Sequence, residues 1–564
     1  MSKRILVIGG VAGGASTAAR ARRLDESAEV VMFEKGPHVS FSNCCLPFYL
    51  SRIVPESDNL VLMDPEQFKK QYNIDALVDE EVVAINREQK TVSVQSKDGK
   101  VREEAYDILM LSPGANPIMP GSIKGLDKPH VFTVRNVVDI VALDEYVREV
   151  DAKNVVIVGG GFVGLEVMEN LRLADRNVTL VEAMDQIMTP FDYDMAQILH
   201  KEIYDQGVNL MLSEQLVEVA DKEVILASGK KLPADVVVMS IGVRPETKLA
   251  QDCGLEIGET GAIKVNHNYQ TSDPNIYAVG DAVEVNCFFT GAPTKLAMAG
   301  PAQRQARAAA GHFYGRTHRN TGVIGSSVVR IFDYNAARTG FNEKQAQRAG
   351  IPYDYVYLIP GDKVGLMPGC HPLFFKLIFE TPSGRILGAQ AIGKGAVDKR
   401  IDVIATLIMM HGTLEDLAEL ELCYSPAYGT AKDVVNHAAL VALNILNCEF
   451  KQIPVTEVRR LVEEKAFIID VREPEEYALS HLKTAVNIPM SEFRQRLDEI
   501  PKDQPVYVHC RSSQRSYNVA RALGQLGFDN IYNIMGSYLG ISFYEYFNDK
   551  ITGREPIVTD YNFN

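Results

Sequence analysis

The sequence predicts a multidomain α/β protein built around parallel sheets with covering helices. Its 564 residues are several times the usual length of a domain, so three or four domains are expected. One design also occurs twice: "RILVIGGVAGGASTAARARR" opens the chain, and "NVVIVGGGFVGLEVMENLR" begins at Asn154. Each copy reads as a β-branched strand, a glycine turn and a helix of small residues. This pattern predicts two Rossmann-like dinucleotide-binding domains.

Composition and charge indicate a globular protein. Hydrophobic residues make up 46% of the chain, and no apolar run approaches the roughly 18 residues of a membrane span. The net charge of −15 disfavours non-specific attraction to nucleic acids or membranes. The start "MSKRILVIGG" passes directly into a strand pattern without the regions of a signal peptide. We therefore expect a cytoplasmic protein without nucleic-acid or membrane partners. The net negative charge is compatible with a local basic pocket for an anionic substrate.

The first glycine unit departs at one place from the usual dinucleotide-binding spacing. Gly9 and Gly14 take the outer positions, but Val11 stands in the middle position. Gly10 and Gly13 are therefore expected to supply some of the backbone freedom that the middle glycine usually gives. Glycines let the backbone approach a pyrophosphate, whose charge then lies at the N-terminus of the following helix. The acid after the second strand falls where a ribose is bound. The predicted ligand contacts of this unit are Gly9, Val11, Ala12, Gly13, Gly14, Glu34 and Lys35.

The second glycine unit fits the spacing fully. Gly159, Gly161 and Gly164 take the three positions, and Phe162 lies between them. Glu182 ends the second strand, where a carboxylate accepts from a ribose 2′-hydroxyl but repels a 2′-phosphate. No arginine follows it directly in "VEAMDQIM", so NADH is favoured over NADPH. The alternative for either unit is a glycine turn that binds no ligand.

Three further segments resemble the FAD-dependent pyridine nucleotide–disulfide reductase family: "YDILMLSPGANP" (106–117), "IGVRPET" (241–247) and "TSDPNIYAVGDAVEV" (271–285). The resemblance implies a discontinuous FAD-binding domain (1–120 and 247–322), an NAD-binding domain (121–246) and an α+β dimerisation domain (323–448) that makes a homodimer. It places Asp281 at the ribitol and phosphate region of FAD. The further cofactor contacts that it implies are Asn43, Val82, Ser112, Pro113, Gly114, Gly242, Gly280 and Asp281.

The stretch "SFSNCCLPF" holds two adjacent cysteines. A dithiol flavoenzyme needs C-x4-C, but Tyr49 stands at the second place counted from Cys44. The stretch resembles "SFANCGLPY" of coenzyme A disulfide reductases and of their single-cysteine relatives, the NADH oxidases and peroxidases. By this match Cys44 is the nucleophile, Ser40 and Asn43 flank it, and Cys45 replaces a small residue. A strained Cys44–Cys45 disulfide is disfavoured, and the remaining alternative is that Cys44 only packs in a core.

Coenzyme A carries phosphates, so basic residues should lie near the cysteine. Arg20 and Arg23 are spaced i and i+3 and therefore lie close together on the first helix. A solvated helix face is the alternative, but the resemblance implies that this helix binds the nucleotide. The substrate contacts implied by the family are Ser16, Arg20, Arg23, Ser40, Asn43 and Lys432.

Two tyrosines in "CYSPAYGTAKDVVN" are candidates for supplying a proton to the leaving thiolate from the other subunit. They are Tyr424 and Tyr428, and packing is the alternative for either one. The family often has a Y-Y-P-G pair elsewhere, whereas this chain reads "GLMPG" (365–369). This chain therefore lacks the tyrosine pair that the family often has there.

In the last hundred residues a new series of strand and helix patterns begins. "FIIDVREPEEYALSHLKTAVNIPMSEF" and "PVYVHCRSSQRSYNVARAL" resemble a rhodanese domain, here 452–552. Cys510 ends a strand, and four residues separate it from Arg515. This spacing favours a sulfur-carrying loop over the longer phosphate-binding loop of dual-specificity phosphatases. Arg511, Arg515 and the helix N-terminus would lower the pKa of the thiol. Ser513 stands where many relatives have glycine, and an inactive packing module is the alternative.

The combination resembles coenzyme A disulfide reductase–rhodanese fusions, also described as NADH-dependent persulfide reductases. It implies FAD-dependent, NADH-driven reduction of coenzyme A persulfide, polysulfide or coenzyme A disulfide through Cys44, with release of sulfide or thiol. Coenzyme A is then a substrate or a tightly bound group, and Cys510 handles sulfane sulfur. Two alternatives remain: an NADH oxidase or peroxidase with Cys44 as a sulfenic acid, and a redox-sensing flavin-binding protein without turnover. None of the eight cysteines forms a C-x-x-C pair, and no metal site is expected.

Overall fold

The computed structural model describes residues 2–563 and divides into two compact units. The first comprises the chain up to Ala183 together with Glu214–Ile324. The second comprises Met184–Ser213 and the chain from Gly325 onward. Within residues 2–563, no helix is both long enough and apolar enough to cross a membrane. The four predicted domain ranges stay predictions.

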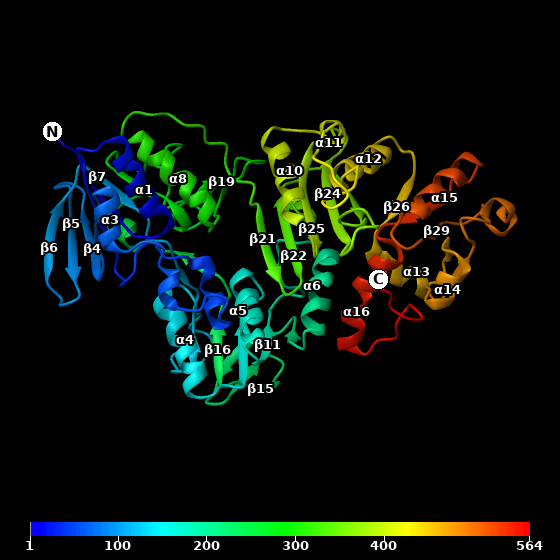
Figure 1. Ribbon diagram of the computed structural model, residues 1–564, viewed down its shortest axis with the longest axis horizontal. Helices are drawn as coiled ribbons and strands as arrows, with labels where there is room; N and C mark the ends of the chain where they lie inside the picture. Colours follow the sequence, from blue (N-terminus) through cyan, green and yellow to red (C-terminus); the bar gives the residue numbers. More distant parts are fainter. Residues whose placement is uncertain (1, 564) are drawn as a thin grey trace. The chain divides into compact units, whose positions relative to one another are not determined.

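The first unit contains two parallel sheets of the same design (Figure 1). The first has the order β18-β7-β1-β2-β3, and the second has the order β11-β10-β16-β9 within this unit. The strands of the first are β1 (Arg4–Ile8), β2 (Glu29–Phe33), β3 (Asp75–Leu77), β7 (Ile108–Leu111) and β18 (Ile276–Ala278). Those of the second are β9 (Val131–Phe132), β10 (Asn154–Val158), β11 (Asn177–Val181) and β16 (Val236–Met239). Strand β12 (Asn209–Met211) belongs to the second unit.

The helices that follow the first strand of each sheet are α1 (Ala12–Leu24) and α5 (Phe162–Leu173). Helix α1 packs against α8 (Ala299–His312). The contact lies in a core that includes Ala18, Ala21 and Ala309, whose small side chains let two helix backbones approach closely. Antiparallel strands β4 (Glu80–Asn86), β5 (Thr91–Ser96) and β6 (Val101–Ala105) form a separate sheet, as do β13 (Leu216–Val219), β14 (Glu223–Leu226) and β15 (Lys231–Pro233). The predicted pair of Rossmann-like sheets is confirmed.

The second unit contains one antiparallel and one parallel sheet. The antiparallel strands, in sheet order, are β21 (Ser327–Ile331), β22 (Tyr334–Gly340), β25 (Ile386–Gly393), β24 (Leu373–Glu380) and β23 (Tyr353–Leu358). Helices α10 (Val397–Met409) and α12 (Val434–Leu446) pack on this sheet. This arrangement is the α+β domain that the sequence predicts.

The C-terminal sheet has the order β26-β30-β29-β27-β28. Its strands are β26 (Lys451–Ile453), β27 (Phe467–Asp470), β28 (Ala485–Asn487), β29 (Val506–His509) and β30 (Ile531–Ile534). The helices of this region are α13 (Val458–Glu463), α14 (Pro474–Leu479), α15 (Gln514–Gln525) and α16 (Ser537–Thr552). The four pairings between neighbouring strands of this sheet are parallel, which confirms the predicted C-terminal α/β domain.

Helix α6 (Tyr193–Asp205) lies in the chain between β11 and β12 but packs against α16 of the C-terminal domain. The rings of His200 and Phe547 are 5.0 Å apart, and those of Tyr193 and Tyr544 are 6.0 Å apart. The side-chain amide of Asn548 also donates to the hydroxyl of Tyr193 at 3.3 Å. The C-terminal domain therefore packs against a helix that follows the second glycine unit in sequence.

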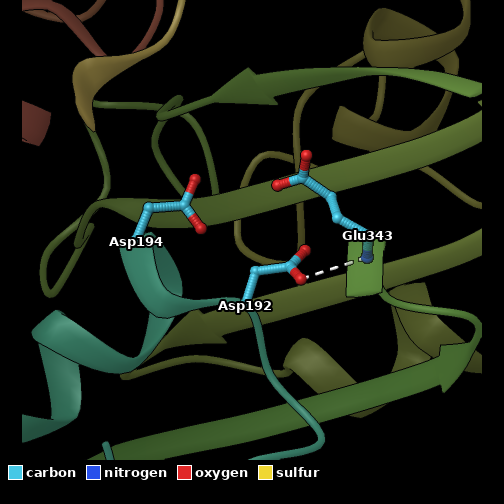
Figure 2. A group of neighbouring side chains, drawn as sticks. All are labelled: Asp192, Asp194 and Glu343. Carbon is cyan, nitrogen blue, oxygen red and sulfur yellow. Dashed lines mark hydrogen bonds between the residues drawn. The ribbon is translucent and has the colours of Figure 1, made fainter. Parts of the chain in front are cut away.

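Three carboxylates, those of Asp192, Asp194 and Glu343, face one another at the start of α6 (Figure 2). The backbone N–H of Glu343 donates to Asp192 at 3.1 Å. The ammonium of Lys376 lies 3.3, 2.8 and 2.6 Å from the three groups, respectively. Burial alone would lower the pKa of Lys376, but the three negative charges raise it well above its usual value. The carboxylates therefore compensate a buried ammonium, and removing Lys376 would leave them unpaired.

Candidate functional site

The two glycine turns have the same backbone geometry. Gly9 and Gly159 adopt φ angles of 93° and 113°, a region that favours glycine. A Cβ on Gly14 would lie 1.7 Å from the carbonyl oxygen of Gly9, and one on Gly164 would lie 1.9 Å from that of Gly159. Strand, turn and helix can approach this closely only because these positions have no side chains.

The acid that ends the second strand contacts the glycine turn in both units. Glu34 accepts from the backbone N–H of Gly10 at 2.8 Å, and Glu182 accepts from that of Gly160 at 2.7 Å. Neither α1 nor α5 carries an acidic residue in its first turn, so the positive end of each helix dipole is not neutralised locally. Each turn thus combines backbone donors for a diphosphate with a carboxylate for a ribose hydroxyl.

The carboxyl ends of parallel strands meet at one edge of each sheet and gather the predicted cofactor contacts there. At the edge of the first sheet lie Gly9, Val11, Ala12, Gly13, Gly14, Glu34, Lys35, Ser112, Pro113, Gly114, Gly280 and Asp281. At the edge of the second lie Gly159, Gly161, Phe162, Gly164, Glu182 and Gly242. The Val82 side chain is instead buried in a hydrophobic core, so only its main chain is available to a ligand.

At the carboxyl edge of the first sheet, residues that follow neighbouring strands lie close together. A Cβ on Gly13 would lie 2.4 Å from the Ser112 hydroxyl. The backbone N–H of Gly280 donates to the Gln305 side chain at 2.7 Å, and burial raises the pKa of Asp281. These contacts fix the ends of β1, β7 and β18 around one space.

Cys44 lies on a short 3₁₀ helix, Asn43–Cys45, just before α2 (Pro47–Leu50). The backbone N–H of Ser40 donates to the carbonyl of Gly10 at 2.7 Å, which holds this segment against the first glycine turn. The Asn43 side chain donates to the carbonyl of Arg135 at 3.1 Å. The structure therefore brings Cys44, Ser40 and Asn43 together with the predicted FAD unit, and Cys44 is an exposed residue.

The surroundings of Cys44 raise the pKa of its thiol. Partial burial raises its pKa, and the negative charges of Glu166 and Asp281 raise it further. The sequence analysis expected a nucleophile at this position, whereas these effects favour the protonated thiol. Cys44 and Cys45 are both free thiols, and a 3₁₀ helix turns consecutive side chains about 120° apart.

Glu166 is a candidate functional residue that the sequence analysis missed. It lies on α5, and burial together with the charge of Glu169 raises its pKa to about 7. The hydroxyl of Ser51, just after α2, donates to Asn170 at 2.5 Å, one turn further along the same face of α5. A glutamate in an amphipathic helix gives no distinctive signal, and only its charge effect on Cys44 in the folded chain singles it out.

The predicted substrate residues divide between the two units. Ser16, Arg20 and Arg23 share α1 in the first unit. Lys432, Tyr424 and Tyr428 belong to the second unit, where the two tyrosines are 50% and 76% exposed. Exposure leaves both phenols free to meet a ligand or a second subunit, and their proposed roles stay predictions.

Cys510 directly follows β29 and begins the loop that leads into α15. Cys510 is 1% exposed, and the Ser516 and Ser537 hydroxyls lie 3.6 and 4.0 Å from its sulfur. Ser513 adopts a φ of 77°, in the left-handed region, which explains why glycine suits this position. Its hydroxyl donates to the carbonyl of Ile534 at 3.0 Å and stabilises that conformation without a glycine.

Arg515 has a partner that the sequence analysis did not foresee. Its guanidinium donates to both oxygens of Glu476 at 2.6 and 2.8 Å. This bidentate contact lowers the pKa of Glu476 and raises that of Arg515, to which the sulfur of Cys510 also contributes. Arg515 is thus held near the sulfur by Glu476, so part of its charge is already compensated.

Comparisons with known families cover almost the whole chain. Residues 3–310 match the pyridine nucleotide-disulphide oxidoreductase family, residues 326–434 match its dimerisation domain, and residues 454–542 match the rhodanese-like domain. Coenzyme A disulfide reductase of Staphylococcus haemolyticus is 34% identical over 438 residues, which is 77% of this chain and 98% of that protein.

Two solved structures resemble nearly the full length. Reduced Bacillus anthracis CoADR-RHD is 41% identical with a TM-score of 0.93, covering 96% of this chain and 98% of its own. The NAD-dependent persulfide reductase from A. fulgidus is 36% identical with a TM-score of 0.91, covering 95% and 99%. The match over residues 3–310 implies an oxidoreductase that uses FAD and NAD(H). The chain belongs to the pyridine nucleotide-disulphide oxidoreductase family.

Proposed function

We propose that this protein uses NADH and FAD to reduce coenzyme A disulfide, coenzyme A persulfide or polysulfide through Cys44. One observation carries the proposal: an exposed single cysteine beside the first glycine turn occurs in the same chain as a sulfur-carrying type of loop around Cys510. The names of the two full-length structural neighbours and of the Staphylococcus relative support it.

The donor set of each glycine turn fits a dinucleotide. The first turn, with Glu34 and Asp281, would hold FAD, and the second turn, with Glu182, would hold NADH. FAD, when bound, supplies the transfer of two electrons from NADH to sulfur. The carboxylate at Glu182 favours NADH, because it would repel the 2′-phosphate of NADPH.

Cys44 acts as the nucleophile in the proposed mechanism. Its sulfur attacks the sulfur–sulfur bond of the substrate, a mixed disulfide or a Cys44 persulfide forms, and a thiolate leaves. For coenzyme A persulfide, one NADH and one proton give NAD⁺, coenzyme A and hydrogen sulfide. For coenzyme A disulfide, the same electrons give two coenzyme A thiols. Tyr424 or Tyr428 of the partner subunit in a homodimer would protonate the leaving thiolate.

Cys510 supplies sulfane sulfur to this reaction in the proposed division of labour. Its persulfide would be held in the loop that ends at Arg515, and coenzyme A would accept the outer sulfur. Ser16, Arg20, Arg23 and Lys432 are the residues proposed to bind coenzyme A.

The test is anaerobic NADH consumption with each sulfur substrate offered separately and sulfide recorded. Cys44→Ser should abolish reduction of every substrate while FAD stays bound, whereas Cys510→Ser should spare coenzyme A disulfide and slow polysulfide use. Cys448→Ser, at an exposed position outside both sites, is the matched control. Full activity of Cys44→Ser would contradict the mechanism, and NADH oxidation only after oxygen or peroxide is admitted would favour the oxidase alternative.

A further inference from the structure

The guanidinium of Arg515 is occupied by a carboxylate of its own domain. Two of its nitrogens donate to the two oxygens of Glu476 at 2.6 and 2.8 Å, one bond to each oxygen. The same carboxylate accepts from the backbone N–H of Glu473 at 3.3 Å, a contact that caps the start of α14. Three donors therefore hold Glu476 in place, so it does not behave as a mobile surface acid.

The pair keeps its charges and is partly shielded from water. Hydrogen bonding to Arg515 lowers the pKa of Glu476, so the carboxylate is ionised at neutral pH. The Arg515 and Glu476 side chains are 32% and 35% exposed, so solvent and salt screen the pair less than a fully exposed one. An anion that approaches Arg515 must displace this carboxylate or share the cation with it.

The sulfur of Cys510 lies beside the arginine of this pair. Ser516 follows Arg515 directly in the chain and places its hydroxyl 3.6 Å from the sulfur. Cys510 itself is 1% exposed, and its sulfur contributes to the raised pKa of Arg515. The loop therefore offers a sulfur donor the charge of Arg511 and the already compensated charge of Arg515.

Two classes of sulfur donor bring different charges to this loop. A persulfide of an organic thiol, R–S–SH, gives its outer sulfur to the thiolate, so that Cys510–S⁻ and R–S–SH become Cys510–S–SH and R–S⁻. Thiosulfate transfers the same atom as a dianion: Cys510–S⁻ and S₂O₃²⁻ become Cys510–S–S⁻ and SO₃²⁻. Sulfite leaves with two negative charges where the thiolate leaves with one. Transfer from thiosulfate therefore depends more strongly on an available cation.

We propose that Glu476 selects the sulfur donor of Cys510: it occupies Arg515 and so favours persulfides of organic thiols over thiosulfate. This inference rests on the proposed function, in which Cys510 carries sulfane sulfur. Leu479 supports the same choice, because it lies three residues beyond Glu476 on α14 and is 77% exposed. An apolar side chain beside the pair suits the organic part of a thiol persulfide and does not attract a sulfonate.

The experiment measures how fast Cys510 takes up sulfur from each donor in the full-length holoenzyme. Cys44→Ser is the background, so that the other reactive cysteine takes no sulfur, and mass spectrometry of the Cys510 peptide records the persulfide. Glu476→Gln keeps the shape of the side chain. It should raise the loading rate from thiosulfate about tenfold and change that from glutathione persulfide less than about twofold. Glu475→Gln, the matched control, removes the same charge from an exposed neighbour on α14 and should change either rate less than about twofold.

A second comparison shows whether the effect acts through Arg515. In an Arg515→Gln background, Glu476→Gln should no longer accelerate loading from thiosulfate. An unchanged thiosulfate rate in Glu476→Gln, or an equal gain in Glu475→Gln, would overturn the inference while the carrier role of Cys510 stands. If Cys510 takes sulfur from neither donor in any variant, the carrier role is wrong and the inference falls with it. Thermal unfolding checks that each variant is folded.

Discussion

The first and second glycine turns lie 150 positions apart and align residue by residue. Gly9 aligns with Gly159 and Gly14 with Gly164, and in both turns the strand-end acid accepts from the second glycine. The two units differ at other aligned positions: Val11 aligns with Gly161, Gly13 with Val163, and Ser16 with Glu166. The shared positions are those where a side chain would strike the turn itself.

The differing positions follow the surroundings of each turn. Gly13 must be small because the Ser112 hydroxyl stands 2.4 Å from where its Cβ would be, whereas Val163 is 41% exposed. A Cβ on Gly161 would meet no atom of the described chain within 4 Å, so the fold alone does not demand glycine there. The outer glycines thus serve the fold, and the middle one is left to serve the ligand.

Substituting the third glycine of each turn should have the greatest effect. Gly14→Ala and Gly164→Ala place a Cβ within 2 Å of a backbone oxygen, which cannot move without opening the turn. We expect each to cost about 3 kcal/mol or more of unfolding free energy. Gly14→Ala should also lose flavin absorbance, whereas Gly164→Ala should keep the flavin but slow its reduction by NADH. Loss of flavin from both variants would contradict the assignment of separate cofactors to the two turns.

Removing the strand-end acids should have the next largest effect. Glu182→Ala loses the contact to Gly160 and the group that would repel a 2′-phosphate. We expect the KM for NADH to rise about tenfold and the preference over NADPH to shrink. Glu34→Ala should instead weaken FAD retention, measured by ultrafiltration. Asp185→Ala, an exposed acid three residues beyond Glu182, is the control, and an equal effect there would argue against a specific ribose contact.

The third difference, Glu166 in the second unit at the position of Ser16 in the first, predicts that the free energy of unfolding depends on pH. The pKa of Glu166 is about 7 in the folded chain and near 4.5 when unfolded, so ionising it costs stability as pH rises through this window. Glu166→Gln should match the wild type below pH 4.5 and be about 1–2 kcal/mol more stable at pH 8, after discounting for partial exposure. Ser16→Ala, at the aligned position of the first unit, should show no such pH dependence. Chemical denaturation of the apoprotein at both pH values measures the difference, and a constant offset would refute the titration.

The smallest effect concerns the middle position. Val11→Gly should change the free energy of unfolding by less than about 0.5 kcal/mol, since glycine is at least as good a helix N-cap as valine. Gly161→Val should leave thermal unfolding unchanged but raise the KM for NADH several-fold, because its side chain would enter the space beside the turn. Unchanged NADH kinetics would show that the middle position does not distinguish the two units.

Local patterns of the sequence predicted both glycine units, their acids and the segment around Cys44. Strand, turn and helix there follow from residues that are neighbours in the chain. Features built by distant residues were not predictable: Glu476 pairs with Arg515, and Lys376 joins Asp194 across 182 residues. No local periodicity encodes such pairs, because each side chain alone reads as an ordinary charged residue.

Ser513 shows a milder limit of local reasoning. Its identity raised doubt about the loop around Cys510, because many relatives have glycine at this position. The structure keeps the left-handed backbone and supports it with a hydrogen bond to Ile534, from a strand that the loop sequence does not contain. A backbone conformation can therefore persist when its usual residue is replaced, provided that a distant acceptor stabilises it.

The contact between α6 and α16 has a practical consequence for shortened forms of this protein. A chain cut before Lys451 would lack α16 and leave the rings of Tyr193 and His200 facing water. His200, whose pKa burial now holds at about 3, would recover a value near 6.5 and titrate close to physiological pH. The uncovered aromatic strip would promote self-association and make such a fragment difficult to purify as a single species. Polar substitutions on α6 would be needed before the reductase part could be handled alone.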